Sequence, residues 1–397
     1  MTPTAADRPP HVSAEQWVDF DFYRPCEPGG DPFLAWKRLQ GGPAMRWTPH
    51  NGGHWIATRG EDIRAILSDW ERFSSSSAFI PKMDRPRGVP LEYDPPAHTP
   101  LRKVLMPAFT PRAVKRWGEE ARALAIDLIA AMQPRGACEF IGEFAQQLPI
   151  IIFLRMMDLP EADREPLLAA VNATLRPRDE AERAEARRYM NAYIAALVDD
   201  RMAAPRDDLL SDALQADIGG RTMNLEEARG LASGLLGGGL DTVASMMGWS
   251  ALFLAENPGH RAQLIETPAL IPKAIEELLR RFAIANIARV VRDRTDYEGA
   301  AMQPGEQVLM SACLHSMDET LFDDPLTVDF KRKDSWKHAT FSYGVHRCIG
   351  APLATAEIRI FLEEWLARIP DFTLDPADPP VRATGIVHGL TRLPLRW

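Results

Sequence analysis

Cys348 stands in a setting that favours a metal-binding thiolate. It lies in a loop with glycines at positions 344 and 350, and residues 351–358, with a proline near their start, have the pattern of a helix. The sulfur is therefore expected near a helix N-terminus, where free N–H groups and the helix dipole favour an anion, and thiolate is the form of cysteine that binds metals. Phe341 and the two glycines would let a flat cofactor approach the backbone while an aromatic ring screens the sulfur. A buried structural cysteine beside a helix cap is the alternative.

A second candidate group is the acid–alcohol pair Asp241-Thr242, which follows three consecutive glycines at 237–239. These residues lie within an apolar stretch that starts with a capping-box pattern at Asn224 and predicts one helix to Glu256, about 33 residues or roughly 50 Å long. Each glycine inside a helix costs about 0.5–1 kcal/mol relative to alanine, so three in succession indicate that another molecule approaches the backbone. Thr242 can hydrogen-bond back to a carbonyl and open the helix locally, while Asp241 can collect protons. A glycine patch for helix packing is the alternative.

A third pair, Glu277 and Arg280, has the i, i+3 spacing that places two charges on one helix face. Such pairs are commonly solvated surface contacts of little energetic value. This pair becomes a candidate for a structural role only because of its position, about 70 residues before Cys348.

Together these motifs resemble the cytochromes P450. The run from Phe341 to Gly350 matches every fixed position of that family's haem-binding loop, Phe-x-x-Gly-x-His/Arg-x-Cys-x-Gly. The glycine-rich acid–alcohol pair and the Glu-x-x-Arg pair occur in the family's order. The resemblance covers essentially the whole chain and is strongest to the soluble bacterial camphor-hydroxylase-like class. It implies a mainly α fold with small β-sheets, a single domain over residues 1–397, and haem between the long oxygen-binding helix and the helix after the cysteine loop.

The resemblance also implies roles for the motif residues. Cys348 would be the axial ligand of haem b, whose electron donation favours cleavage of the O–O bond. Dioxygen would bind on the opposite face, and Asp241 and Thr242 would organise the two protons that release water. Glu277 and Arg280 would brace the core behind the haem loop without a catalytic role. The remaining candidates for contact with haem or its propionates are His98, Arg102, Arg289, His346, Phe341 and Gly238.

The expected substrate pocket differs from that of the camphor enzymes. Its candidate residues are Phe79, Gly234, Gly237, Gly238, Ala285, Ile287, Ile386 and Val387. The camphor enzymes carry a tyrosine in the loop before Asp-Pro-Pro that binds the ketone, whereas here Pro86 is nearest to that place and Tyr93 is displaced. The glycines at 234 and 237 replace larger apolar residues. The sequence therefore favours a larger apolar substrate, a terpenoid or a norisoprenoid, over camphor.

Because the chain contains no flavin or nicotinamide fingerprint, its electrons are expected from a two-iron two-sulfur ferredoxin with its reductase. The expected docking face carries the cations Arg102, Lys103, Lys337 and Arg347. The formal net charge of −9 argues against general binding of nucleic acid. A haem-thiolate isomerase, dehydratase or peroxygenase would not need the acid–alcohol pair. A non-enzymatic haem gas sensor would need a linked output domain, for which the chain leaves no room.

The expected surroundings are those of a cytoplasmic monomer. No stretch approaches the roughly 20 apolar residues of a membrane span, and residues 1–10 have no signal-peptide core. The four cysteines are scattered, which suits a reducing compartment.

Apolar periodicity and turn residues predict the elements that must position these groups. A β-rich N-terminal part is expected at 31–75, with a hairpin at 45–58, and an irregular loop at 74–94. A helical core is expected at 98–282 and the haem-binding loop at 341–350. The expected helices are 31–39, 61–67, 94–108, 111–132, 140–157, 161–175, 180–203, 224–256 and 272–282. The expected strands outside the hairpin are 288–292, 307–310, 372–374 and 390–397.

Overall fold

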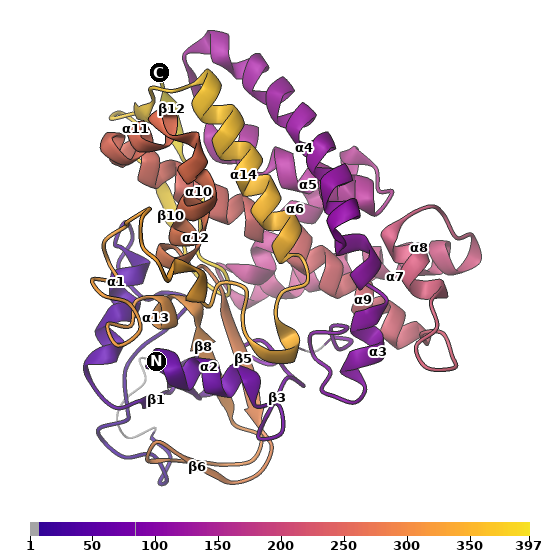
Figure 1. Ribbon diagram of the computed structural model, residues 1–397. Helices are drawn as coiled ribbons and strands as arrows, with labels where there is room; N and C mark the ends of the chain where they lie inside the picture. Colours follow the sequence, from indigo (N-terminus) through magenta and orange to yellow (C-terminus); the bar gives the residue numbers. More distant parts are fainter. Residues whose placement is uncertain (1–7, 84) are drawn as a thin grey trace.

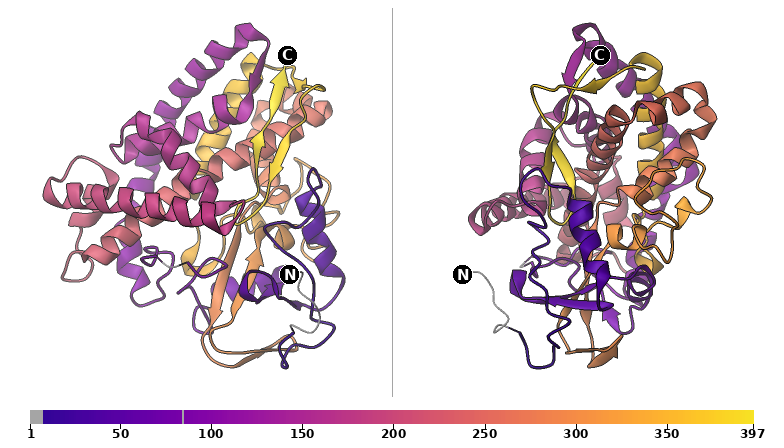
Figure 2. Two further views of the ribbon diagram at one scale, coloured as in Figure 1. Left: turned by 180° about the vertical axis from the view of Figure 1, so that it is seen from behind. Right: turned by 90° about the vertical axis from the view of Figure 1, so that its left-hand side faces the viewer.

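The computed structural model describes residues 8–83 and 85–397, and it is mainly helical with small sheets. Figure 1 shows most of the helices above and to the right of the five-stranded sheet, and Figure 2 shows the same division from behind. In this described part of the chain, no helix is both long enough and apolar enough to cross a bilayer.

The predicted helices occur in the predicted order, and two of them, α4 and α7, have the predicted bounds, whereas α8, α11 and α13 lie outside every predicted helix. The helices are α1 Pro32–Lys37, α2 Gly60–Ser68, α3 His98–Lys103, α4 Pro111–Met132, α5 Gln147–Met156, α6 Arg164–Leu175, α7 Glu180–Ala203, α8 Leu209–Gln215, α9 Leu225–Gly239, α10 Thr242–Glu256, α11 Pro258–Glu266, α12 Ile271–Arg281, α13 Ala312–Ser316 and α14 Ala351–Arg368. The helix predicted over 94–108 is shorter, because the chain turns after α3 into a 3-10 helix at Met106–Phe109. Helix α14, which follows Cys348, packs along α4.

The largest sheet joins segments that lie far apart in the sequence. Its strands are β1 Met45–Thr48, β2 His54–Ala57, β8 Gln307–Ser311, β5 Asn286–Val291 and β3 Phe73–Ser74, in that spatial order. The predicted hairpin is present as the antiparallel pair β1–β2, and β2 then pairs in parallel with β8. The N-terminal strands are therefore built into one sheet with strands from beyond residue 285.

The smaller sheets lie apart from this one. They are β4 Ala137–Glu139 with β12 Pro394–Arg396 and β9 Thr373–Leu374, β10 Val381–Ala383 with β11 Gly389–Arg392, and β6 Thr295–Tyr297 with β7 Ala300–Met302.

The long central helix predicted over 224–256 is wrong as one continuous element. It is divided into α9 and α10 at Asp241, whose backbone has φ −137° and ψ −34°. The capping box at Asn224 is confirmed. The break follows the glycine run, where the Phe153 ring lies so close to Gly239 that a Cβ there would overlap it. Helix α10 itself is buried along nearly its whole length, as its apolar sequence predicts.

Glu277 and Arg280 form a fully buried ion pair on α12. Each of the two carboxylate oxygens of Glu277 accepts a hydrogen bond of 2.8 Å from the guanidinium of Arg280, and both side chains are 0% exposed. Arg280 also donates to the carbonyls of Ser316 and Pro325, at 2.9 and 2.7 Å. The pair therefore ties α12 to the segment that leads toward the cysteine loop.

Glu277→Gln is expected to lower the free energy of unfolding by about 3–5 kcal/mol, because it leaves the Arg280 charge buried without its partner. Urea denaturation of the purified protein measures this loss. The matched control is Glu276→Gln on the same helix, whose side chain is 36% exposed and pairs with His338 at 3.4 Å. The control is expected to change stability by less than about 1 kcal/mol, and equal losses in the two variants would contradict a bracing role for Glu277.

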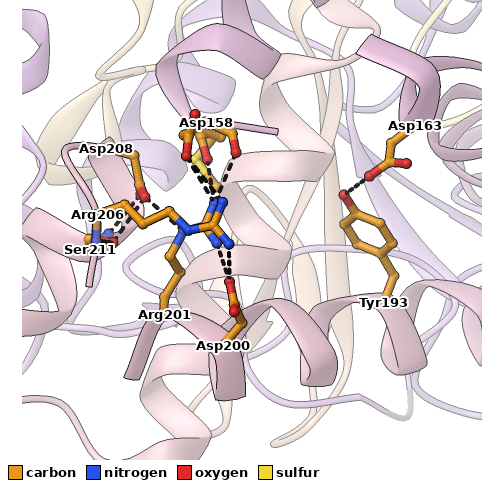
Figure 3. A network of polar contacts seen from close by, with 9 residues as sticks. Asp158, Asp163, Tyr193, Asp200, Arg201, Arg206, Asp208 and Ser211 are labelled. Carbon is orange, nitrogen blue, oxygen red and sulfur yellow. Dashed lines mark hydrogen bonds and ion pairs between the residues drawn. The ribbon is translucent and has the colours of Figure 1, made fainter. Parts of the chain in front are cut away.

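The C-terminal end of α7 is fixed by a buried arginine. Arg201 is 2% exposed, and it donates to Asp208 at 2.7 Å and to the Asp158 carbonyl at 3.0 Å. Figure 3 shows Arg201 between Asp208 and Asp200, and beside them the hydrogen bond of 2.7 Å from Tyr193 to Asp163. These contacts hold α7 against the end of α5 and the start of α6, so the connection between α6 and α7 lies at the opposite end, where it reaches the site described next.

Candidate functional site

The cysteine loop is shaped by one glycine and one backbone hydrogen bond. Gly344 has φ +68°, and a Cβ there would lie 3.0 Å from the carbonyl oxygen of Leu67. The Cys348 N–H donates to the Phe341 carbonyl at 2.8 Å, and α14 begins three residues after Cys348. The cysteine is thus held in a closed turn at the N-terminus of a long helix, as the sequence predicts.

The Cys348 sulfur lies beside an open cavity and near two arginines. A cavity of about 480 Å³ opens beside the residue, with Arg102 and Arg347 in its wall. Burial by the protein on the other sides raises the pKa of the Cys348 thiol, although the N–H groups of Gly350 and Ala351 and the charge of Arg102 oppose that rise. A bound metal cation deprotonates a coordinating thiol, and the cavity beside the sulfur leaves room for such a centre.

Arg289 is a buried cation without an anionic partner in the described part of the chain. The residue is 0% exposed, and its guanidinium donates to the carbonyl of the adjacent Ala288 at 2.9 Å, while Nη2 has no hydrogen-bond partner. Burial lowers its pKa to about 10, and the charge of Asp94 opposes this shift. Among the described residues, no carboxylate lies in hydrogen-bond contact with this guanidinium.

His98 and His346 lie next to each other with unused hydrogen-bonding groups. Their ring centroids are 4.5 Å apart, and both nitrogens of His98 and Nε2 of His346 are buried without a partner. Burial, followed by the charges of Arg289, His98 and Arg102, lowers the pKa of His346 to about 2. Burial and Arg102 likewise lower the pKa of His98. A charge-balancing anion at this place would satisfy donors that the described protein leaves open.

The four predicted propionate residues are therefore brought together, and they fit the group. A haem carries two carboxylates on one edge, which Arg289, Arg102 and the two histidines can bind. Arg102 keeps further donors available after donating to the Arg347 carbonyl at 2.6 Å. Buried polar groups without partners and a cysteine beside an open cavity are the two features that fit a haem-thiolate site here.

The acid–alcohol pair is held in two different ways. Thr242 donates its hydroxyl to the Gly238 carbonyl at 3.0 Å, as predicted. Asp241 is 3% exposed, and both of its oxygens accept from the guanidinium of Arg176, at 3.0 and 2.6 Å. Ser245 donates to the same carboxylate at 3.2 Å.

Arg176 and Ser245 are site residues that the sequence reasoning missed. Ser245 is one turn beyond Asp241 and its i+4 spacing was an available signal. Arg176 lies 65 positions before Asp241, directly after α6, and no local pattern links the two. Arg176 also donates to the Val387 carbonyl at 2.8 Å, so it joins the α6–α7 connection to the acid and to the predicted pocket.

Open space lies beside two of the three glycines. A Cβ at Gly237 or at Gly238 would have no atom within 4 Å, and Gly238 is exposed although it sits between buried helical turns. Gly234 differs, because a Cβ there would lie 2.9 Å from the Val89 carbonyl oxygen. The expectation that Gly234 adds room to the pocket is therefore wrong, and the room lies at Gly237 and Gly238.

The other predicted pocket residues lie on β5 and on loops that contact it. Ala285 bridges to Val387, and the Asn286 N–H donates to the Ile386 carbonyl at 2.9 Å. Phe79 is half-buried and lies on the loop that joins β5 through a hydrogen bond of 2.8 Å from the Ala288 N–H to the Ala78 carbonyl. Ile287 is half-buried on β5 itself.

The predicted docking cations gather on the cysteine side. Arg102 and Arg347 line the 480 Å³ cavity, and Arg347 and Lys337 line an adjacent cavity of about 570 Å³. Trp336, which is 65% exposed, lies in the wall of this second cavity. Lys103 is exposed at the end of α3.

Comparison with known proteins agrees with this geometry. A family model described as cytochrome P450 matches residues 269–385. The chain is 36% identical to a probable cytochrome P450 127A1 of Sinorhizobium fredii, over 93% of this chain and 91% of the relative. It is similar to the crystal structures of cytochrome P450 CYP101C1, with TM-score 0.88 and 38% identity, and of CYP101J2, with TM-score 0.87 and 34% identity. Both alignments cover 98% of this chain and 99% of the other.

Proposed function

Because the chain belongs to the cytochrome P450 family and is a haem-b-dependent monooxygenase, we propose that it hydroxylates an apolar terpenoid or norisoprenoid with electrons from a two-iron two-sulfur ferredoxin. The observation that carries the proposal on substrate is the open space beside Gly237 and Gly238, next to the acid–alcohol pair. Haem, when bound, supplies the activation of dioxygen and the insertion of one oxygen atom into a C–H bond.

We propose that haem is held by Cys348 and by the cluster of Arg289, Arg102, His98 and His346. The sulfur would bind the iron, and the cluster would bind the two propionates. Support for the cluster is the set of buried donors without partners. The same donors disfavour an empty site, because each unpaired buried polar group is unfavourable by roughly 1–3 kcal/mol.

Proton supply falls to Asp241 and Thr242. Both oxygens of Asp241 are engaged by Arg176, so this carboxylate can take a proton from solvent only when the ion pair opens. Thr242 lies one residue further on, and its hydroxyl proton is directed to the Gly238 carbonyl. This arrangement keeps the hydroxyl oxygen free to accept a hydrogen bond on the side where Gly238 leaves space.

The pocket favours a larger ligand than camphor. The missing tyrosine removes one neutral hydrogen bond, worth about 0.5–1.5 kcal/mol. A ligand that buries about 100 Å² more apolar surface gains roughly 2.5 kcal/mol. The second effect is larger, so shape and apolar area outweigh a directional contact in choosing the substrate.

The norisoprenoid β-ionone, with a ring and a side chain, is therefore expected to bind at least about tenfold more tightly than camphor. Titration of each compound, followed by displacement of the haem's water ligand in the absorbance spectrum, measures this ratio. Gly237→Leu is the matched variant, because it fills the open space beside α9. This variant is expected to weaken the binding of β-ionone more than the binding of camphor. If the wild type bound camphor more tightly than every larger terpenoid, the proposed substrate class would be contradicted.

A ferredoxin would dock on the cysteine side. Arg102, Arg347 and Lys337 lie around the two cavities there, on a chain whose formal net charge is −9. A local basic patch on an acidic protein steers an acidic partner to one place, and exposed Trp336 adds an aromatic contact of the kind that anchors interfaces.

A further inference from the structure

One buried carboxylate organises the loop that carries Phe79. Glu92 is 5% exposed, and it accepts hydrogen bonds from the N–H groups of Ala78, at 3.1 Å, and Gly88, at 2.6 Å. Ala78 lies near the start of the irregular segment between β3 and α3, and Gly88 lies just past its middle. A single side chain therefore fixes the separation of the Phe79 end of the segment from its middle.

Arg85 completes this arrangement. Its guanidinium pairs with Glu92 at 3.1 Å, and its side chain is 13% exposed. The same guanidinium lies over the Phe79 ring, with Cζ 5.5 Å from the ring centroid. Contact of this kind between a cation and an aromatic face is attractive, so Glu92 acts on the Phe79 ring through Arg85.

Gly88 packs beside the ion pair. A Cβ at this position would lie 3.3 Å from Nη1 of Arg85 and 3.4 Å from Oε2 of Glu92. Gly88 therefore lies directly beside both charged groups.

Two glycines of α9 let the loop pack directly against the helix. The Val89 N–H donates to the Gly230 carbonyl at 3.2 Å. A Cβ at Gly230 would overlap the Arg87 carbonyl oxygen, and one at Gly234 would lie 2.9 Å from the Val89 carbonyl oxygen. The loop backbone therefore contacts the helix backbone directly, and a shift of the loop would move it along the helix that carries Gly237 and Gly238.

We propose that Glu92 and Arg85 are specificity-determining positioning residues, which lock the loop onto α9 and present Phe79 as a preformed wall of the substrate pocket. This inference rests on the proposed function, because it takes Phe79 to face the bound substrate. A wall that is fixed before binding spares the ligand the cost of ordering the loop. It also restricts the orientations in which a large apolar molecule presents its C–H bonds.

The experiment compares Glu92→Gln, Arg85→Gln and the double variant with Lys82→Gln. Lys82 is the matched control, because it carries the same charge as Arg85 on the same loop but donates outward to the Gly305 carbonyl at 3.1 Å. Amide hydrogen exchange of peptides covering 76–81 and 87–93 is measured on the haem-loaded protein without substrate. The β-ionone dissociation constant and the product distribution are measured in parallel.

Glu92→Gln and Arg85→Gln are expected to speed exchange in both peptides, to weaken β-ionone binding by about tenfold, and to broaden the product distribution. The double variant is expected to equal Glu92→Gln alone, because the two residues act as one unit. Lys82→Gln is expected to match the wild type. All variants are expected to keep the haem content and carbon-monoxide spectrum of the wild type.

Wild-type exchange in both peptides of Glu92→Gln would overturn the proposal, and so would a double variant whose losses are the sum of the two single ones. If Glu92→Gln does not fold, Arg85→Gln provides the test, because it leaves the hydrogen bonds from the backbone to Glu92 in place. Wild-type exchange in both of its peptides would then overturn the proposal. Faster exchange in the Glu92 and Arg85 variants, with no binding of β-ionone even by the wild type, would support the lock and refute the proposed substrate class.

Discussion

Cys348→Ser is expected to abolish the red-shifted absorbance band that the reduced, carbon-monoxide-bound protein shows when thiolate ligates haem. A serine hydroxyl is not an anion near neutral pH and is a poor ligand for haem iron. The surrounding groups that assist a thiolate, the N–H groups of Gly350 and Ala351 and the charge of Arg102, are too weak to ionise an alcohol. The expected result is loss of the band, with or without loss of haem, and loss of monooxygenase activity.

The matched control for this experiment is Cys138→Ser. Cys138 is 8% exposed on β4, and burial raises the pKa of its thiol to about 12, as suits an inert core cysteine. The control is expected to keep the spectrum of the wild type. A Cys348→Ser protein that retained the thiolate band would assign the axial ligand to another residue.

Local signals predicted much of this molecule. The bounds of α4 and α7, the capping box at Asn224 and the β1–β2 hairpin each depend on residues within a few positions of one another, and all are present. The cysteine loop is local in the same way, since its shape depends on Gly344 and on a bond between residues 341 and 348.

Contacts between distant segments were beyond the reach of sequence patterns. The Phe153 ring, which packs against Gly239 beside the break at Asp241, belongs to another helix. Arg176 has no sequence spacing that relates it to Asp241. Likewise, no sequence pattern distinguishes the glycines at 230 and 234, which pack against a loop, from glycines that border the pocket. Helical periodicity predicts which face is apolar, but it does not predict what covers that face.

Asp241→Asn is expected to slow product formation by roughly a hundredfold, at the lower end of the range for a lost proton carrier. Asparagine preserves the shape of the side chain, and Arg176 keeps its bonds to the Val387 carbonyl and to Asn172, at 2.8 and 2.9 Å. Substrate affinity is therefore expected to change by less than about threefold, since the pocket wall stays in place. The rate of the variant is expected to show a larger solvent deuterium isotope effect than that of the wild type, because proton delivery becomes limiting.

Two further variants separate proton supply from anchoring of the α6–α7 connection. Thr242→Ala is expected to bind substrate and consume reductant at near-normal rates but to release much of the oxygen as hydrogen peroxide, because the hydroxyl that accepts and directs the proton is lost. Arg176→Gln breaks the ion pair and leaves the Asp241 carboxylate, so it is expected to weaken substrate binding more than it slows product formation. If Asp241 served only to hold Arg176, then Asp241→Asn and Arg176→Gln would weaken binding alike, and neither would show the isotope effect. Steady-state rates in ordinary and deuterated water, with peroxide assayed in each, distinguish the two roles of this buried carboxylate.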